Sequence, residues 1–303
     1  MNGHAVKIKL SRFDRGFVTA NTSLLILCAL AVIYPLIYIV SASFSSPDAL
    51  ASGRVWLLPV EPSLRGYGAV FRSQKIWIGY RNSVLYAVVG TSLNIVMTIL
   101  AGYTLSRKDF LGRGLIMKGM VFTMLFSSPI VTSYLLVHRL GLIDTFWAMI
   151  FPSAMNVMNV IITRTYFQSS IPMDLYYAAE MDGCSDIQII TRIVLPLSKP
   201  IIAVMVLFYA LNHWNAYFHA LLYLNREQLF PLQLILREIF MMNEIDPNML
   251  ETAFSDAELQ QRQDIKDLLK YAIIIVANAP MLMAYPFVQR YFVKGVMIGA
   301  IKG

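Results

Sequence analysis

Residues 16–47 read GFVTANTSLLILCALAVIYPLIYIVSASFSSP, a stretch without a single aspartate, glutamate, lysine or arginine. About 20 apolar residues suffice for a helix to cross the roughly 30 Å hydrocarbon core of a bilayer. Basic residues before this stretch and Ser41-Ala42-Ser43 near its end imitate a secretory signal with its cleavage site. The apolar run is longer than the about 7–15 residues of such a signal. We therefore expect an uncleaved first membrane-spanning helix.

Five further uncharged runs follow, so that the sequence predicts six membrane-spanning helices in all. The expected spans are about 17–43, 82–106, 119–138, 145–164, 200–224 and 271–290. Prolines lie inside several of these runs, and a membrane bundle tolerates them because neighbouring helices satisfy the freed backbone groups. A soluble helical protein is the alternative. It is disfavoured because 57% of the residues are hydrophobic and only 14% are charged, against about 25% charged in soluble domains. The predicted fold class is an all-α polytopic membrane protein.

The distribution of lysine and arginine sets the expected orientation. If the N-terminus is cytoplasmic, the inner side carries 14 basic and 6 acidic residues, and the outer side carries 11 basic and 12 acidic residues. This bias places both termini in the cytoplasm. It also explains the net charge of +7 as membrane topology, which leaves no support for a nucleic-acid partner. The two cysteines match neither a metal motif nor a disulfide framework.

The largest polar segment is the outer loop 225–270, which carries 9 acidic and 5 basic residues. Apolar residues recur among the charges from Met249 to Leu269, which predicts a surface helix there. Loops of this length between packed helices are usually functional or disordered. We expect this extracytoplasmic loop to contact an external partner, and a solvated connector is the alternative.

The inner segment 170–200 reads SIPMDLYYAAEMDGCSDIQIITRIVLPLSKP. Pro172 suits the start of a helix that runs from about Met173 to Asp182, and Gly183 can end it in the left-handed conformation. Ser185 followed by Gln188 is the pattern of a capping box that starts a second helix. That helix is expected to present Ile187, Ile190, Ile193 and Val194 and to end at Pro196. The 170–200 loop is thus predicted to be two short helices joined at a glycine; a loop that only packs against its own bundle is the alternative.

This loop resembles the EAA loop of ABC importer membrane subunits, whose pattern is Glu-Ala-Ala, three residues, Gly, nine residues, Ile, one residue and Leu-Pro. Tyr177-Ala178-Ala179, Gly183, Ile193 and Leu195-Pro196 match every spacing. The sequence departs from the pattern at one position, because Tyr177 stands where the family has glutamate and Glu180 follows three residues later. The ending YFVKGVMIGAIKG at 291–303 is similar to that of the carbohydrate branch, which is related to maltose permeases and includes a subgroup for complex oligosaccharides.

The resemblance implies a type I ABC importer permease fold in a bacterial cytoplasmic membrane. Its implied partners are a second permease, two ATPase subunits, an extracytoplasmic solute-binding protein, membrane lipid and a sugar substrate. The loop would sit in a groove of the ATPase, and the implied coupling residues are Tyr177, Ala178, Ala179, Glu180, Asp182, Gly183, Ile187, Ile190, Leu195 and Pro196. The chain itself contains no GxxxxGK[ST] motif. We therefore expect no enzyme activity and no cofactor in this chain, with ATP and Mg bound by the partner ATPases.

Two other function classes can be weighed against this one. An ion-coupled secondary transporter usually carries acids or bases within its spans, whereas the six runs contain only histidines, namely His138, His213 and His219. A membrane-embedded enzyme would need a catalytic cluster, and the Asn212–Asn215 segment with His219 is the nearest candidate. We reject the enzyme because no carboxylate lies nearby in sequence, and we keep the secondary transporter as the alternative.

The polar residues inside the expected spans are mainly amides and aromatics. The candidates for lining a sugar path are Asn94, Asn156, Asn159, Asn212, His213, Trp214, Asn215 and Tyr217. A sugar needs hydrogen-bond partners for its hydroxyl groups and aromatic faces for its C–H surface, and residues 212–217 supply both within about two helical turns. The alternative is that these amides hold the helices together, a role worth about 0.6–2 kcal/mol each in membranes.

Overall fold

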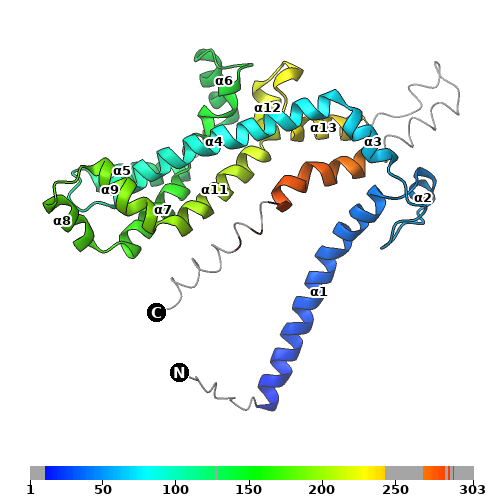
Figure 1. Cartoon of the computed structure of the whole chain (residues 1–303), viewed down its shortest axis with the longest axis horizontal. Helices are drawn as coiled ribbons and strands as arrows, with labels where there is room; N and C mark the ends of the chain where they lie inside the picture. Colours follow the sequence, from blue (N-terminus) through cyan, green and yellow to red (C-terminus); the bar gives the residue numbers. More distant parts are fainter. Residues whose placement is uncertain (1–10, 127, 243–268, 284–285, 287–288, 290–303) are drawn as a thin grey trace. The chain divides into compact units, whose positions relative to one another are not determined.

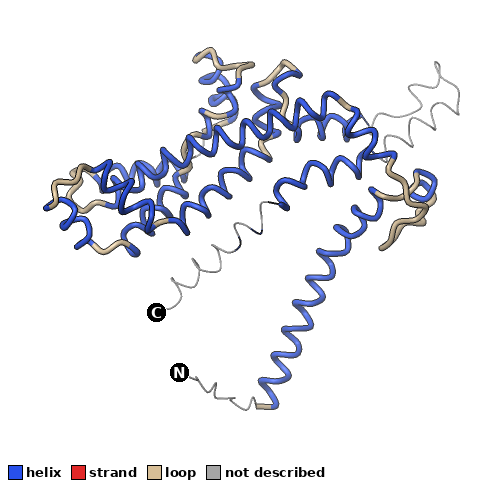
Figure 2. Tube along the Cα trace, in the orientation of Figure 1, coloured by secondary structure: helices blue, strands red, loops and turns tan. Residues whose placement is uncertain are grey.

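The computed structural model describes residues 11–126, 128–242, 269–283, 286 and 289. Every regular element within these ranges is a helix (Figure 2). The chain divides into two compact units, the first made of residues 1–70 and 246–275 and the second of residues 71–245 and 276–303. The prediction of an all-helical chain is confirmed for the described residues.

The first unit is built around α1 (Arg12–Ser43), which begins with a capping box between Ser11 and Asp14. None of the most apolar part of α1 is buried, which suits a helix that faces lipid or another chain. After α1 the chain folds back through α2 (Pro47–Ala51). Ser41 and Ser45 fix this turn, because the Ser41 hydroxyl donates to Leu57 O over 2.6 Å and the Ser45 hydroxyl accepts from Val60 N over 3.1 Å.

The second unit is built around α4 (Gln74–Ser106), against which α7 (Val157–Ser170) and α11 (Lys199–Trp214) pack (Figure 1). Helix α4 begins eight residues before the expected span of 82–106, so Lys75 and Arg81 belong to it. Small residues allow the helices to approach closely. A Cβ on Gly102 would lie 3.1 Å from Thr163 Cγ2 of α7. The short helix α3 (Arg65–Arg72) precedes α4.

The third and fourth expected spans are broken rather than continuous, and the fifth is interrupted between Trp214 and Tyr217. The third consists of α5 (Arg113–Leu125) and α6 (Ile130–Arg139), and Pro129 is the N-cap of α6. The fourth consists of η1 (Phe146–Met149) and η2 (Phe151–Ser153), which contains Pro152, followed by α7 at an angle of 53°. Pro129 lies at the first break, and Pro152 lies in η2 just ahead of the bend. A proline lacks the N–H that would continue a helix. Pro35, by contrast, is accommodated within α1.

Within the described residues, two helices are long and apolar enough to cross a membrane, namely α1 and α4. The number rises to five if each bent pair of helices forms one span. A further apolar helix, Leu269–Met283, is shorter than these. A membrane protein with several candidate spans is therefore confirmed, whereas six continuous spans are not.

The first part of the expected outer loop is ordered against α4. After α12 (Tyr217–Tyr223) and η4 (Glu227–Leu229), α13 (Leu232–Met242) packs along α4. The Asn82 amide donates to Gln228 O and Phe230 O over 2.7 and 3.0 Å, and Leu232 N donates to the Ser83 hydroxyl over 2.9 Å. The surface helix expected from Met249 to Leu269 lies almost entirely outside the described residues.

Asp144, in the loop after α6, binds the segment that follows α12. Its carboxylate accepts the backbone N–H groups of Asn225 and Arg226 over 3.0 Å each and pairs with the Arg226 guanidinium over 2.6 Å. These hydrogen bonds hold the pKa of Asp144 below its usual value. Asp144 has a φ of +60°, a conformation that aspartate tolerates better than most residues. Asp144 thus links the segment that precedes residue 145 to the segment that follows residue 224.

Candidate coupling loop and translocation path

The first half of the 170–200 loop folds as its sequence predicts. Helix α8 (Met173–Met181) follows Pro172, and Gly183 ends it with a φ of +73°. Gly183 N donates to Glu180 O over 3.0 Å and Cys184 N donates to Ala179 O over 2.9 Å, which is the Schellman arrangement of a helix end. Helix α9 (Asp186–Ile189) then starts with the predicted capping box between Ser185 and Gln188.

The second half differs from the prediction, because Pro196 does not end the helix. A π-helical turn, η3 (Ile190–Val194), continues α9 and is followed by α10 (Leu195–Leu197). Pro196 therefore lies inside this continued helix, as the second residue of α10. The chain turns at Ser198 before α11 begins. Single π turns inside helices occur frequently at functional sites.

Three large apolar side chains lie on the outer surface of the loop. Met181 is 88% exposed, Ile187 is 73% exposed and Tyr177 is 55% exposed. Ala178, Asp182, Gly183 and Pro196 are also exposed, and Leu195 is partly buried. Two of the expected coupling residues point the other way, since Ala179 and Ile190 are buried. The expectation that Ile190 and Val194 face outward is therefore wrong, because both side chains belong to the core on the inner side of the loop.

The inner surface of the loop shares a hydrophobic core with the helices of the second unit. Tyr176, Ile189, Ile190 and Val194 of the loop belong to one buried cluster. The same cluster contains Tyr103 of α4, Phe167 of α7, and Ile201, Met205 and Tyr209 of α11. The loop thus packs against its own bundle on one side and presents apolar side chains on the other.

The end of α4 meets the loop through polar contacts. Arg107, which is 8% exposed, pairs with Asp109 over 3.1 Å and with Glu180 of α8, and its guanidinium lies 4.9 Å from the centre of the Tyr176 ring. Tyr103 donates its hydroxyl to Asp186 over 2.7 Å. Burial alone would lower the pKa of Arg107, but its hydrogen bonds to Asp109 and Glu180 raise this pKa above the usual value. The hydrogen bond with Arg107 lowers the pKa of Asp109.

Side chains of α7 donate hydrogen bonds to backbone carbonyl groups at the end of α4. Arg164 donates to Leu105 O over 2.9 Å and Gln168 donates to Ser106 O over 3.1 Å. The last carbonyl groups of a helix have no partner within it, so these two side chains stabilise the point at which α4 meets the loop.

Three of the candidate path residues are buried in the bundle and form hydrogen bonds there. The Asn94 amide donates to Ser153 O over 2.5 Å, and its carbonyl oxygen lies 2.6 Å from His213 Nε2. Asn94 is fully buried and His213 is 2% exposed. Because the Asn94 oxygen can only accept, Nε2 of His213 carries the proton. Trp214, also buried, donates its indole N–H to Ala277 O over 3.2 Å. These residues hold helices together, as the alternative interpretation expected.

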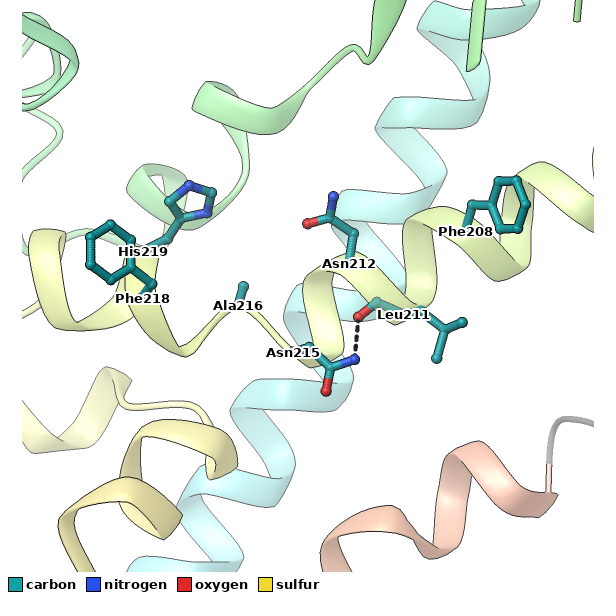
Figure 3. A pocket seen from close by; sticks show the side chains of 7 residues that line it. All are labelled: Phe208, Leu211, Asn212, Asn215, Ala216, Phe218 and His219. Atoms are coloured by element: carbon teal, nitrogen blue, oxygen red, sulfur yellow. Dashed lines mark hydrogen bonds between the residues drawn. The ribbon is translucent and has the colours of Figure 1, made fainter. Parts of the chain in front are cut away.

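Two of the other candidates line an open cavity of about 530 Å³ at the break between α11 and α12 (Figure 3). Asn212 and Asn215 lie in its wall, together with Phe208, Leu211, Ala216, Phe218 and His219. The Asn215 amide donates to Leu211 O over 3.0 Å. The exposed Asn156 caps α7 by accepting from Asn159 N over 3.1 Å, and Tyr217 is 44% exposed. The cavity wall does not include Asn156, Asn159 or Tyr217.

The family model for the binding-protein-dependent transport system inner membrane component matches residues 76–298. The chain belongs to this family. It is 39% identical over 280 residues to the polygalacturonan/rhamnogalacturonan transport system permease protein YtcP of Bacillus subtilis, covering 92% of this chain and 96% of that protein. It is 38% identical over 271 residues to protein LplC of the same organism, covering 89% of this chain and 90% of that protein.

A solved structure agrees with this assignment. A crystal structure of a bacterial ABC transporter involved in the import of the acidic polysaccharide alginate contains a chain with a TM-score of 0.86 and 34% identity. The match covers 94% of this chain and 100% of that chain. The permease is therefore a transmembrane component of an ABC transporter with the ABC importer permease fold, as its EAA-like loop predicts.

Sequence reasoning about the permease missed several residues of these two sites. Phe208, Leu211, Ala216 and Phe218 line the cavity but look like ordinary apolar residues of a span. On α11 the available signal was the spacing of three to four residues that places Phe208, Leu211 and Asn212 on one helix face. Ala216 and Phe218 lie beyond the end of α11. Arg107 was counted only as a loop charge. A cation placed directly after the uncharged run 82–106 was the signal that could have singled it out.

Proposed function

We propose that this permease forms, with a second permease, the membrane path of an ABC importer for oligosaccharides derived from acidic polysaccharides. The observation that carries the proposal is the similarity over 94% of the chain, at a TM-score of 0.86, to a chain of an alginate importer. The name of YtcP, which refers to polygalacturonan and rhamnogalacturonan, supports the same class of cargo. A solute-binding protein would deliver the sugar, and two ATPase subunits would supply the energy.

The proposed contact with an ATPase is the outer surface of the 170–200 loop. Tyr177, Met181 and Ile187 are large, apolar and more than half exposed, and burying such side chains against a partner is favourable. Ala178, Asp182, Gly183 and Pro196 contribute the exposed surface between them. Ala179, Ile190 and Leu195 take part from the inner side by fixing the shape of the loop. ATP and Mg would be bound by the ATPase subunits.

The proposed sugar path includes the cavity at the break between α11 and α12. Its wall combines the amides of Asn212 and Asn215 with the aromatic rings of Phe208 and Phe218. Ligand sites generally combine apolar and aromatic walls with a few polar groups that fix orientation. The break itself leaves non-helical backbone at membrane depth, which is tolerated where it lines a cavity.

The cavity can be tested by substitution. Phe218→Ala removes an exposed ring and Asn212→Ala removes one hydrogen-bonding side chain, worth about 1 kcal/mol. We expect each variant to lower the initial rate of sugar uptake about fivefold, with unchanged yield of the membrane complex. Phe122→Ala is the matched control, since it removes a 59% exposed ring from α5. Uptake by Phe218→Ala equal to that of Phe122→Ala would exclude the cavity from the path.

The proposed topology has six spans with both termini in the cytoplasm. Its spans are α1, α4, the pair α5–α6, the segment from η1 to α7, the broken helix α11–α12, and the helix that includes Leu269–Met283. We pair α11 with α12 rather than with the preceding 186–197 segment, because that segment contains Asp186 and Arg192 and belongs to the 170–200 loop. The outer loop 225–270 would then contact the solute-binding protein.

Cysteine labelling tests this topology. In a variant without Cys28 and Cys184, a membrane-impermeant maleimide applied from outside should label Asp48→Cys and spare Asp182→Cys. Both positions are accessible, since Asp182 and Asp48 are exposed, and permeabilised cells provide the control for reactivity. Labelling of Asp182→Cys in intact cells would show that the orientation is reversed.

The cargo is tested with purified components. The permease complex is reconstituted with its ATPases and its binding protein, and ATP hydrolysis is measured with oligogalacturonates, alginate oligosaccharides and neutral malto-oligosaccharides. We expect the acidic oligosaccharides to stimulate hydrolysis several-fold and the neutral ones to leave it at the level without sugar. Stimulation by neutral oligosaccharides alone would contradict the proposed cargo.

A further inference from the structure

One buried cation connects the longest helix of the second unit to the 170–200 loop. Arg107 follows the last residue of α4, and its guanidinium lies over the Tyr176 ring and pairs with Glu180. Tyr176 and Glu180 are four residues apart on α8 and therefore lie on one face of that helix. The arginine thus contacts α8 through two side chains at once.

The second carboxylate beside Arg107 plays a different part. Asp109 pairs with Arg107 over 3.1 Å, but it is only two residues away on the same segment and its side chain is 67% exposed. It compensates the charge without joining separate elements. Among the described ion pairs, Arg107 with Glu180 is the one that links the end of α4 to α8. Guanidinium Nη1 is buried and has no hydrogen-bond partner in the described part of the chain.

A buried arginine constrains position more strongly than an apolar residue does. Leaving a buried charge without its partner is strongly unfavourable, and the fork of guanidinium donors fixes the geometry of its carboxylate partners. Movement of α8 away from α4 therefore breaks the ion pair and exposes the aromatic contact. The hydrogen bond from Tyr103 to Asp186 adds a similar link on the other side of Gly183.

We propose that the Arg107–Glu180 pair is the positioning link that passes movement of the 170–200 loop to α4. The proposal rests on the proposed function of the loop as the contact with an ATPase. Glu180 then acts within the chain rather than on the ATPase, because its carboxylate is engaged by Arg107. Tyr177, which stands at the position of the glutamate in the family pattern, points outward and is 55% exposed.

The test uses Glu180→Gln in the reconstituted complex with its ATPases and binding protein. This change keeps the size of the side chain and removes the charge through which Arg107 pairs with α8. We expect the amount of sugar imported per ATP hydrolysed to fall at least about fivefold, with the yield of the complex unchanged. The control is Asp174→Asn, which removes one carboxylate from the exposed start of the same helix and should import like the wild type. Equal coupling in Glu180→Gln and Asp174→Asn would overturn the proposal.

A distance measurement separates positioning from a general loss of stability. Spin labels are placed at Thr104 of α4 and Leu175 of α8, which are both exposed, in a complex without the native cysteines. We expect one narrow distance distribution with Glu180 present and a clearly broader one with Glu180→Gln. Identical distributions would show that the pair does not position α8.

A double variant keeps the proposal falsifiable if a single change prevents assembly. Replacing a buried ion pair with apolar residues often preserves stability, so Arg107→Met with Glu180→Met should restore the yield. Because methionine is flexible and specifies no unique geometry, we expect import per ATP to stay low. Wild-type coupling in the double variant would overturn the proposal. A wild-type complex that shows no sugar-stimulated hydrolysis would instead contradict the proposed function itself.

Discussion

A valine at position 90 is expected to abolish assembly of the membrane complex. Gly90 lies in α4 where α11 crosses it, and a Cβ there would lie 2.5 Å from Cε1 and 2.8 Å from Cδ2 of His213, and closer still to Nε2. The ring cannot move aside easily, because it is 2% exposed and bonded to Asn94. Excess volume in a packed core costs about 1–3 kcal/mol or more. The contact between α4 and α11 would therefore fail.

The measurement is the amount of intact complex recovered from membranes by affinity purification and size-exclusion chromatography. Gly119→Val is the matched control, because a Cβ at Gly119 of α5 meets nothing within 4 Å. We expect a loss of at least tenfold for Gly90→Val and little change for the control. Removing the imidazole ring with His213→Ala should partly restore recovery of the complex in a Gly90→Ala variant. Normal recovery of Gly90→Val would show that α11 does not pack closely against α4 at this position.

Gly183→Val is expected to uncouple ATP hydrolysis from import. Gly183 has a φ of +73° and a Cβ there would meet nothing within 4 Å, so the penalty lies entirely in the backbone. A side chain in this conformation costs about 1–2 kcal/mol, and β-branched residues suit it least. The Schellman hydrogen bonds at Glu180 and Ala179 would loosen, and the angle between α8 and α9 would change. Tyr177 and Ile187 could then no longer present one surface.

Uptake and sugar-stimulated ATP hydrolysis are measured together with the yield of the complex. We expect Gly183→Val to assemble but to lose at least about tenfold in sugar imported per ATP. Gly183→Asn is the control, because asparagine tolerates positive φ better than other non-glycine residues, and it should retain most of the coupling. If Gly183→Val hydrolyses ATP and imports sugar like the wild type, the loop is not the coupling element.

Local signals in the sequence predicted local structure well. The capping box at Ser185 and the glycine end of α8 at Gly183 depend on neighbouring residues alone, and both are confirmed. The broken third and fourth spans depend on Pro129 and Pro152. A proline inside an apolar run can either bend a helix or end it, and packing by other helices decides which occurs. Composition alone could not make that choice.

Contacts between residues far apart in the sequence could not be predicted from the sequence alone. Asn94 and His213 are separated by 119 positions, so nothing in their spacing showed that they bond to each other instead of lining a path. Ile190 follows Ile187 by three positions in a helical pattern, yet Ile190 is buried in the core and Ile187 is 73% exposed. The functional family was nevertheless predictable, because the EAA-like spacing lies within one contiguous loop. A sugar cargo was also predictable from the 291–303 ending, whereas the proposal of an acidic cargo rests on the relatives alone.

The source of energy for import is the most direct test of the central claim. Proteoliposomes that contain the permease, its second permease and its ATPases are supplied with binding protein and a labelled acidic oligosaccharide. We expect accumulation only when ATP and Mg are enclosed, with no effect when a proton or sodium gradient is dissipated. Accumulation driven by an ion gradient without ATP would contradict the account and favour a secondary transporter.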